Sequence, residues 1–178
     1  MTVLVAMLRA VNVGGRRVKM ADLVKLFAEI GFADARTHLQ SGNVVFDAGR
    51  AKRADVAAGI EAAIEERCGF RSEAILRSAA DFETLIAANP FPEMAEKDPS
   101  HLVVNFFAGR PTAADKAALE MAWDGPEEWR LVGEDLFITY PAGIGNSKLK
   151  LKLKTPATMR NWKVVNALAA MAADMGRA

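Results

Sequence analysis

Four cationic side chains and two adjacent glycines follow the first apolar run of the sequence: Arg9, Gly14, Gly15, Arg16, Arg17 and Lys19. The apolar run, residues 2–8, is typical of a buried strand, and an amphipathic helical pattern begins at Met20. The stretch is therefore predicted to be a loop that leads from a strand into a helix. Backbone N–H groups in such a loop, together with the helix dipole, suit an anion. An arginine can hold two oxygens of that anion at once.

Polar side chains from a second segment are expected beside this loop. A Ser-Gly turn at 41–42 separates two predicted strands. In a βαββαβ unit with right-handed crossovers, the loop after the first strand and this turn lie at the same end of the sheet. Asn12, Ser41 and Asn43 should then complete an anion-binding corner. The alternative is structural: the glycines form only a tight turn, and the two asparagines bond to the loop backbone. The loop matches neither the Walker nor the dinucleotide-binding fingerprint.

A second basic region lies near the C-terminus. Four lysines alternate with three leucines over 148–154, and no acidic residue occurs over 136–173. A strand would place the lysines on one face, either to keep an exposed edge from pairing or as a strip that follows phosphates. A helix is predicted for 155–173, with Thr155 as N-cap and Pro156 at its first position. The candidate ligand-binding residues of this region are Ser147, Lys148, Arg160 and Asn161.

Patterns for catalysis by a triad or a metal are absent from the sequence. The two histidines, His38 and His101, are too few for either, and the single cysteine, Cys68, is expected to be a small buried hydrophobe. We therefore predict no metal and no cofactor. A net charge of +1 restricts polyanion binding to local patches. No apolar run reaches the roughly 20 residues that cross a bilayer, and no signal-peptide pattern is present, so a cytoplasmic protein without a membrane partner is expected.

The order of the periodic patterns predicts an α+β fold. It is a tandem duplication of ferredoxin-like βαββαβ units, with mostly antiparallel sheets and helices on one face. The first unit is predicted at 1–78, and a connecting helix with a proline-rich linker at 79–100. The second unit, 101–178, contains an apolar strand, a helix at 113–123, a hairpin and the C-terminal helix. It reads as βαββα, a near copy of the first without a clear final strand.

Several short segments resemble one family of bacterial conserved proteins. They are R-A-V-N-V-G-G from Arg9, M-A-D-L from Met20, Q-S-G-N-V-V-F from Gln40, N-P-F from Asn89 and T-M-R-N-W from Thr158. This combination, which spans nearly the whole chain, is similar to domain-of-unknown-function family 1697. The resemblance implies a duplicated ferredoxin-like fold and no established activity, substrate or cofactor. Two departures are visible: Ala10 stands where the family commonly has glycine, and Lys163-Val164 replace two polar residues after R-N-W.

Three functions are compatible with these features. The first is non-catalytic binding of a phosphate-bearing ligand or nucleic acid at the glycine-basic loop, where only the second unit has strand aromatics that could stack bases. The second is an enzyme for a small phosphorylated or carboxylated metabolite, in which Arg9, Lys148 and Arg160 stabilise developing charge. The third is a structural or partner-binding protein. It requires Arg9, Asn43 and Arg160 to be buried and bonded within the protein.

Overall fold

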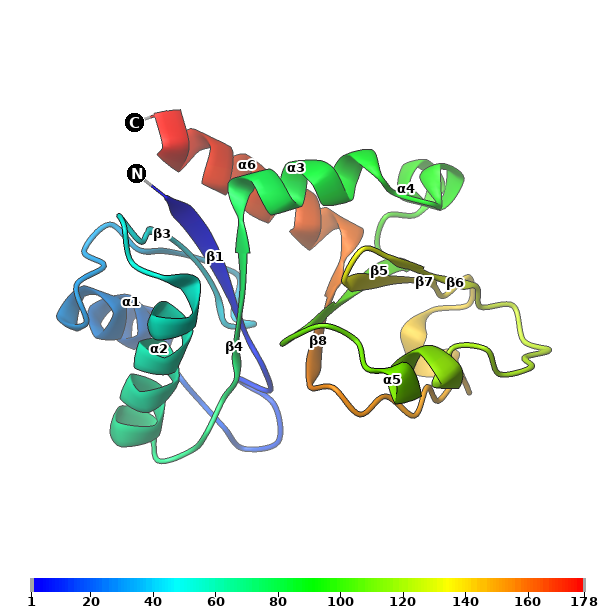
Figure 1. The fold of residues 1–178 in the computed structure, drawn as a ribbon, viewed down its shortest axis with the longest axis horizontal. Coiled ribbons are helices and arrows are strands. Elements are labelled where there is room, and N and C mark those ends of the chain that lie inside the picture. The colour runs from blue at the N-terminus through cyan, green and yellow to red at the C-terminus, as the bar shows by residue number, and fades with distance from the viewer. Residues whose placement is uncertain (1, 178) are drawn as a thin grey trace. The chain divides into compact units, whose positions relative to one another are not determined.

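The computed structural model describes residues 2–177, which form two four-stranded antiparallel sheets with their helices (Figure 1). The chain divides into two compact units. The first unit runs up to Thr84 and also takes the chain from Ala167 onward, whereas the second unit is Leu85–Asn166. The predicted α+β class and the tandem ferredoxin-like arrangement are confirmed.

The first unit has the complete βαββαβ order, followed by a helix. Its elements are β1 (Val3–Leu8), α1 (Met20–Glu29), β2 (Arg36–His38), β3 (Asn43–Asp47), α2 (Arg53–Cys68), β4 (Ala74–Ser78) and α3 (Ala79–Ala87). The strand order in the sheet is β2-β3-β1-β4. It makes β1 and β3 antiparallel neighbours, with Met7 opposite Asn43. The first loop and the Ser-Gly turn therefore lie at one end of the sheet, as the topology predicted.

The continuous apolar sequence of β1 is explained by burial on both faces. Leu4, Ala6 and Leu8 share one core with residues of α1 and α2, such as Phe27 and Ile60. The residues between them, Val3, Val5 and Met7, are buried as well. Each large apolar side chain in this core stabilises the fold by about 1.5–3 kcal/mol relative to exposure. The sheet and the two helices thus form a rigid base for the loop after β1.

The second unit repeats the sheet but not every helix. Its elements are α4 (Pro92–Lys97), β5 (Leu102–Phe107), α5 (Ala113–Ala118), β6 (Trp129–Val132), β7 (Asp135–Thr139), the 3₁₀ turn η1 (Ile144–Asn146), β8 (Ala157–Asn161) and the start of α6 (Trp162–Arg177), a helix that belongs to the first unit from Ala167 onward. The strand order β6-β7-β5-β8 has the same form as the order in the first unit. Strand β8 occupies the place of β4, and α6 follows it directly, as α3 follows β4.

The prediction of a helix over 155–173 is wrong in its first part. Residues 157–161 form β8, because β5 pairs with β7 on one side and with β8 on the other, placing Val104 opposite Arg160. The element that the second unit lacks is therefore the second crossover helix and not the last strand. Residues 148–154 stand in its place as an extended segment outside any sheet.

Two further boundaries differ from the sequence prediction. The helix predicted at 113–123 ends at Ala118. The proline-rich stretch contains the short helix α4, with Pro92 at its start, where a proline costs nothing because the missing N–H has no helical partner. No helix within residues 2–177 combines the length and the apolar character needed to cross a membrane.

Candidate functional site

Asn12 holds the loop after β1 in shape. Its Nδ2 donates to the carbonyl oxygens of Gln40, at 2.6 Å, and Val18, at 3.1 Å, and its Oδ1 accepts from the Val18 N–H at 2.9 Å. The residue adopts a left-handed conformation, φ 58°, which asparagine tolerates better than most side chains. Asn12 therefore connects the start of the loop, its end and the β2–β3 turn. This matches the structural alternative for this side chain.

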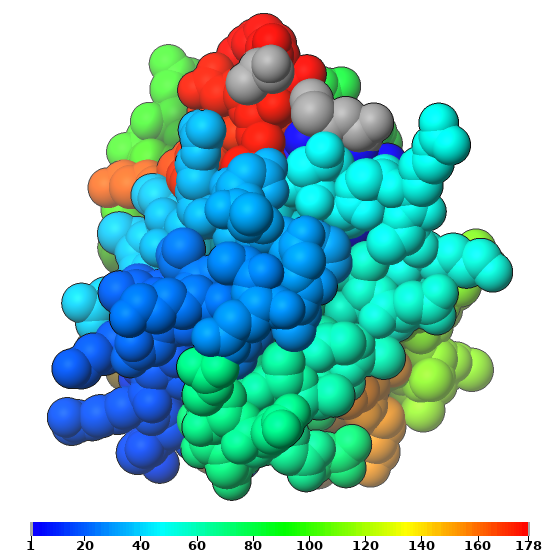
Figure 2. All heavy atoms as spheres, turned by 90° about the vertical axis from the view of Figure 1, so that its left-hand side faces the viewer, coloured from blue at the N-terminus to red at the C-terminus, as the bar shows by residue number. Residues whose placement is uncertain are grey.

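The glycine pair forms a tight turn at the tip of the loop. The Arg16 N–H donates to the Val13 carbonyl at 3.2 Å, and the Asn12 N–H donates to the Arg16 carbonyl at 2.7 Å. Gly14, Gly15 and Arg16 are exposed. Figure 2 shows this loop and the start of α1, in blue, at the lower left of the first unit, with side chains that project from the surface. The pair thus shapes the tip of the loop.

The cations of the loop separate into two groups. Arg9, whose side chain is 44% exposed, pairs with Glu73 at 3.3 Å, and the Arg16 guanidinium lies 5.7 Å from the centre of the Phe70 ring. Burial raises the pKa of Glu73, but hydrogen bonds and the charges of Arg9 and Arg16 outweigh it and leave that pKa lowered. Arg17 and Lys19 form the second group and line a groove.

The β2–β3 turn is bonded within itself. Asn43 is 0% exposed, and its Nδ2 donates to the His38 carbonyl at 3.1 Å and to Ser41 Oγ at 2.8 Å. The Leu8 N–H donates to the Gly42 carbonyl at 2.9 Å. The loop after β1 and the β2–β3 turn are therefore in contact, as predicted. Asn43 stabilises the turn from a buried position and does not face a ligand site.

The groove is the strongest candidate site of the first unit, with a volume of about 810 Å³. Three cations, one carboxylate and four other side chains line it: Arg17, Lys19, Arg67, Asp22, Asn12, Val18, Gln40 and Cys68. Of the candidates from the sequence, the structure places Asn12 and Lys19 here. Arg9, Gly14, Gly15, Arg16, Ser41 and Asn43 do not line it. The groove thus gathers positive charge from the loop, the start of α1 and the end of α2.

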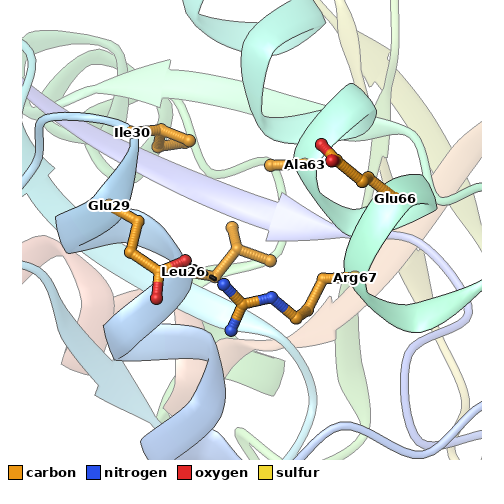
Figure 3. A pocket seen from close by; sticks show the side chains of 6 residues that line it. All are labelled: Leu26, Glu29, Ile30, Ala63, Glu66 and Arg67. Carbon is orange, nitrogen blue, oxygen red and sulfur yellow. Dashed lines mark hydrogen bonds and ion pairs between the residues drawn. The ribbon is translucent and has the colours of Figure 1, made fainter.

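Arg67 was missed as a candidate, although topology could have located it. Strand β4 runs antiparallel to β1 with Ala74 opposite Leu8, so the end of α2 must return to the level of the loop after β1. Arg67 also lines a cavity of about 490 Å³ between α1 and α2. In Figure 3 its guanidinium points at the Glu29 carboxylate, with which it forms an ion pair, while Glu66 points away. Part of its charge is therefore already compensated.

The first turn of α1 opens onto the same groove. Lys19 is the N-cap residue, and no side chain caps the helix. The amides of Met20 and Ala21 find no acceptor within residues 2–177. Uncapped amides and the helix dipole together favour an anion at this position. Burial raises the pKa of the Cys68 thiol at the groove wall, so this sulfur is protonated at neutral pH and is a poor nucleophile.

Arg160 and Asn161 lie in β8 and not in the first turns of the last helix, where the helix predicted at 155–173 would have placed them. Arg160 is only 8% exposed and donates to Thr158 Oγ1 and to the Met159 carbonyl, both at 2.8 Å. Burial lowers its pKa to about 10. Asn161 Oδ1 accepts from the Val164 N–H at 3.0 Å and so caps α6. Arg160 and Asn161 therefore have structural roles.

Ser147 and Lys148 have different surroundings. Ser147 Oγ accepts from the Leu149 N–H at 3.0 Å, and its hydroxyl is the main cause of a lowered Glu127 pKa. Lys148 is exposed. The strand aromatics considered for base stacking are all buried: Phe106, Phe107, Phe137 and Tyr140. These four rings cannot stack on bases without unfolding the sheet.

We expect Asn12→Ala to loosen the groove more than it destabilises the core. The substitution removes three hydrogen bonds to Val18 and Gln40, at about 0.5–1.5 kcal/mol each, so the free energy of unfolding should fall by about 2 kcal/mol. Urea denaturation measures this loss. Limited proteolysis should also become faster between Val13 and Lys19. Unchanged stability and unchanged proteolysis in this loop would contradict the bracing role.

Comparisons with known proteins identify the fold and the family of this chain but no activity. The structure resembles the conserved bacterial protein SP0830 from Streptococcus pneumoniae, with a TM-score of 0.79 and 22% sequence identity over 97% of this chain and 98% of that one. At that identity the likeness supports the fold alone. No curated protein matches the sequence. The model of the family described as "Protein of unknown function (DUF1697)" matches residues 1–137, and the chain therefore belongs to this family.

Proposed function

We propose that the first unit binds a phosphate-bearing ligand in the groove beside the start of α1. The observation that carries the proposal is the convergence of Arg17, Lys19 and the uncapped first turn of α1 on one open groove. Phosphate suits this arrangement because it accepts several charge-assisted hydrogen bonds at once from arginine, lysine and backbone N–H groups.

The charge balance of the groove favours an anion of moderate size. Asp22 is the one carboxylate among the lining residues, against three cations. Arg67 shares its charge with Glu29, so Arg17 and Lys19 supply most of the attraction. A volume of about 810 Å³ can hold a nucleotide or a sugar phosphate. A longer nucleic acid could bind here only by placing one of its phosphates in the groove.

Binding explains the groove better than catalysis does. Electrostatic catalysis would need a reacting group beside the cations. The nucleophilic side chain that lines the groove is the thiol of Cys68, and its partial burial raises its pKa. Arg160, one of the three cations of the enzyme hypothesis, lies in β8 and is hydrogen-bonded there. The residues that line the groove thus offer recognition of charge and shape.

The test is a thermal-shift and calorimetric titration with inorganic phosphate, pyrophosphate, nucleoside phosphates and sugar phosphates. A ligand that binds only the folded state raises its stability by about 2.7 kcal/mol at a hundredfold excess over Kd. We expect at least one of these compounds to raise Tm. The double variant Arg17→Gln, Lys19→Gln should weaken its binding tenfold or more, because each lost charge-assisted hydrogen bond contributes about 1.5–3 kcal/mol.

A matched control separates local recognition from overall charge. Lys25→Gln with Arg36→Gln removes the same charge from exposed positions that do not line the groove, and it should leave affinity within about twofold. Equal losses in both double variants, or no Tm increase with any compound, would refute a phosphate site in this groove. Tighter binding of an oligonucleotide than of its mononucleotide would extend the ligand beyond a small molecule.

A further inference from the structure

The extended segment Lys148–Lys154 presents a row of lysines on the second unit. Residues alternate in exposure along it: Leu149, Leu151 and Leu153 are half-buried, and the lysines between and beside them are exposed. The three leucines pack against the core formed by β5 and β7, which includes Phe107 and Ile138. The three leucines of this segment therefore cover the core of the second sheet, as the crossover helix α2 covers the core of the first sheet.

Both ends of this lysine row are fixed. At one end the Leu149 N–H donates to Ser147 Oγ at 3.0 Å. At the other end Thr155 Oγ1 donates to the buried Asp115 carboxylate at 2.6 Å, and the Thr155 N–H donates to the same group at 3.2 Å. The segment is the orange ribbon that leads into β8 in Figure 1. Its four ammonium groups thus project from a backbone that is held in place before any ligand arrives.

Within the described chain the lysine row has no ion-pair partner, although the Glu127 carboxylate lies at its Ser147 end, where it is hydrogen-bonded by the Ser147 hydroxyl. Within residues 2–177, none of its four lysines forms an ion pair, and no acidic residue lies between 136 and 173. The carboxylate at its end, Asp115, is buried and occupied by hydrogen bonds. The backbone N–H groups of residues 150–153 make no hydrogen bond with the described chain, so these four amides are available to an acceptor.

We propose that the lysine row binds the phosphate backbone of single-stranded nucleic acid. Alternate residues of an extended chain lie about 6.6 Å apart, a spacing that lets each lysine meet one phosphate of an extended strand. A single straight row fits one strand, whereas reading a duplex usually requires a helix or ribbon that enters a groove. Because Phe106, Phe107, Phe137 and Tyr140 are buried and none of them can stack on bases, we expect binding to be electrostatic and indifferent to sequence.

The experiment measures binding of a fluorescent 12-nucleotide single strand at several salt concentrations. Four neutralised phosphates give a slope of log K against log salt of about −3, since each contributes about −0.7 on a single strand. Affinity should then fall roughly fiftyfold between 50 and 200 mM salt. Replacing all four lysines by glutamine should flatten the slope to near zero and weaken binding at least tenfold at 50 mM salt.

A charge control and a milder variant accompany the quadruple substitution. Glutamine at Lys25, Arg36, Arg50 and Lys52, four exposed cations of the first unit, removes the same charge and should keep the slope. The double variant Lys150→Gln, Lys152→Gln gives about half the change if the quadruple variant folds poorly. An unchanged slope in the lysine-row variants, equal loss in the control, tighter binding of a duplex, or equal affinity for a polyglutamate peptide would each overturn the proposal. The Arg17 and Lys19 variant is expected to keep this slope, so the two sites fail independently.

Discussion

Asp115→Ala is expected to lower the free energy of unfolding by about 3–5 kcal/mol, because it leaves a set of buried donors without their acceptor. Asp115 is 0% exposed. Its carboxylate accepts from the hydroxyls of Thr112 and Thr155, both at 2.6 Å, and from the backbone N–H groups of Thr112, Lys154 and Thr155. It therefore fixes the start of α5 through a capping box and also fastens the end of the lysine row.

The stabilisation by Asp115 should depend on pH in a defined direction. Burial raises the pKa of this carboxyl, but the hydrogen bonds from Thr112, Thr155 and Lys154 outweigh it and hold the pKa far below its usual value. The ionised form is thus favoured in the folded state. Its contribution is complete above the unfolded-state pKa, about 4, and is lost as the pH falls below that value.

The measurement is urea denaturation of the wild type and of Asp115→Asn and Asp115→Ala at pH 7 and pH 3. Asparagine keeps the size of the side chain and one acceptor oxygen, so it should cost less than alanine. The stability gap between wild type and either variant should shrink at pH 3. Other carboxyls with lowered pKa values, such as Asp47 and Asp81, are present in all three proteins and cancel in the comparison. A gap that does not change with pH would refute the role of the ionised carboxylate.

The first sheet could be predicted from sequence because hydrophobic pattern and turn chemistry agree there. β8 could not, because its pattern is inverted. Thr158 and Arg160 are the buried residues of this strand, and Met159 between them is 45% exposed. Thr155-Pro156 and the alanine-rich stretch that follows also carry helix-start signals. Pairing with the free edge of β5 overrides these local preferences.

Only one part of the candidate site could be predicted from the sequence: which loops lie side by side, because the order of the strands determines this. Topology brought the loop after β1 beside the β2–β3 turn, and the hydrogen bond from Asn12 to Gln40 confirms that contact. Side-chain direction was not predictable. Arg9 pairs with Glu73 and Arg16 contacts Phe70, and both partners are distant in sequence. Of the four cations of the loop, only Arg17 and Lys19 therefore line the groove. Ala10 has a left-handed φ of 55°, a conformation that glycine adopts more readily than alanine.

Gly42→Ala is the second substitution with a large expected effect, and it connects the fold to the groove. Gly42 has φ +71°, and a Cβ there would lie 3.0 Å from the Cβ of Leu8 and 3.1 Å from that of Val11. Both neighbours are buried and their Cβ atoms move only with the backbone. Left-handed strain of about 1–2 kcal/mol and crowding of about 1–3 kcal/mol should together lower the free energy of unfolding by about 2–5 kcal/mol.

Gly49→Ala isolates the crowding from the strain. Gly49 has a similar φ, +60°, but an added Cβ meets no atom within 4 Å, so its substitution should cost only the strain of about 1–2 kcal/mol. Because Val11 precedes Asn12, displacement of Val11 by Gly42→Ala should also shift the groove and reduce the Tm increase given by a phosphate ligand, whereas Gly49→Ala should keep that increase. Urea denaturation and ligand titration of the two variants measure both effects. Equal losses of stability in the two variants would show that the turn yields to the added methyl group, and that its close packing on β1 and the loop does not hold the groove in shape.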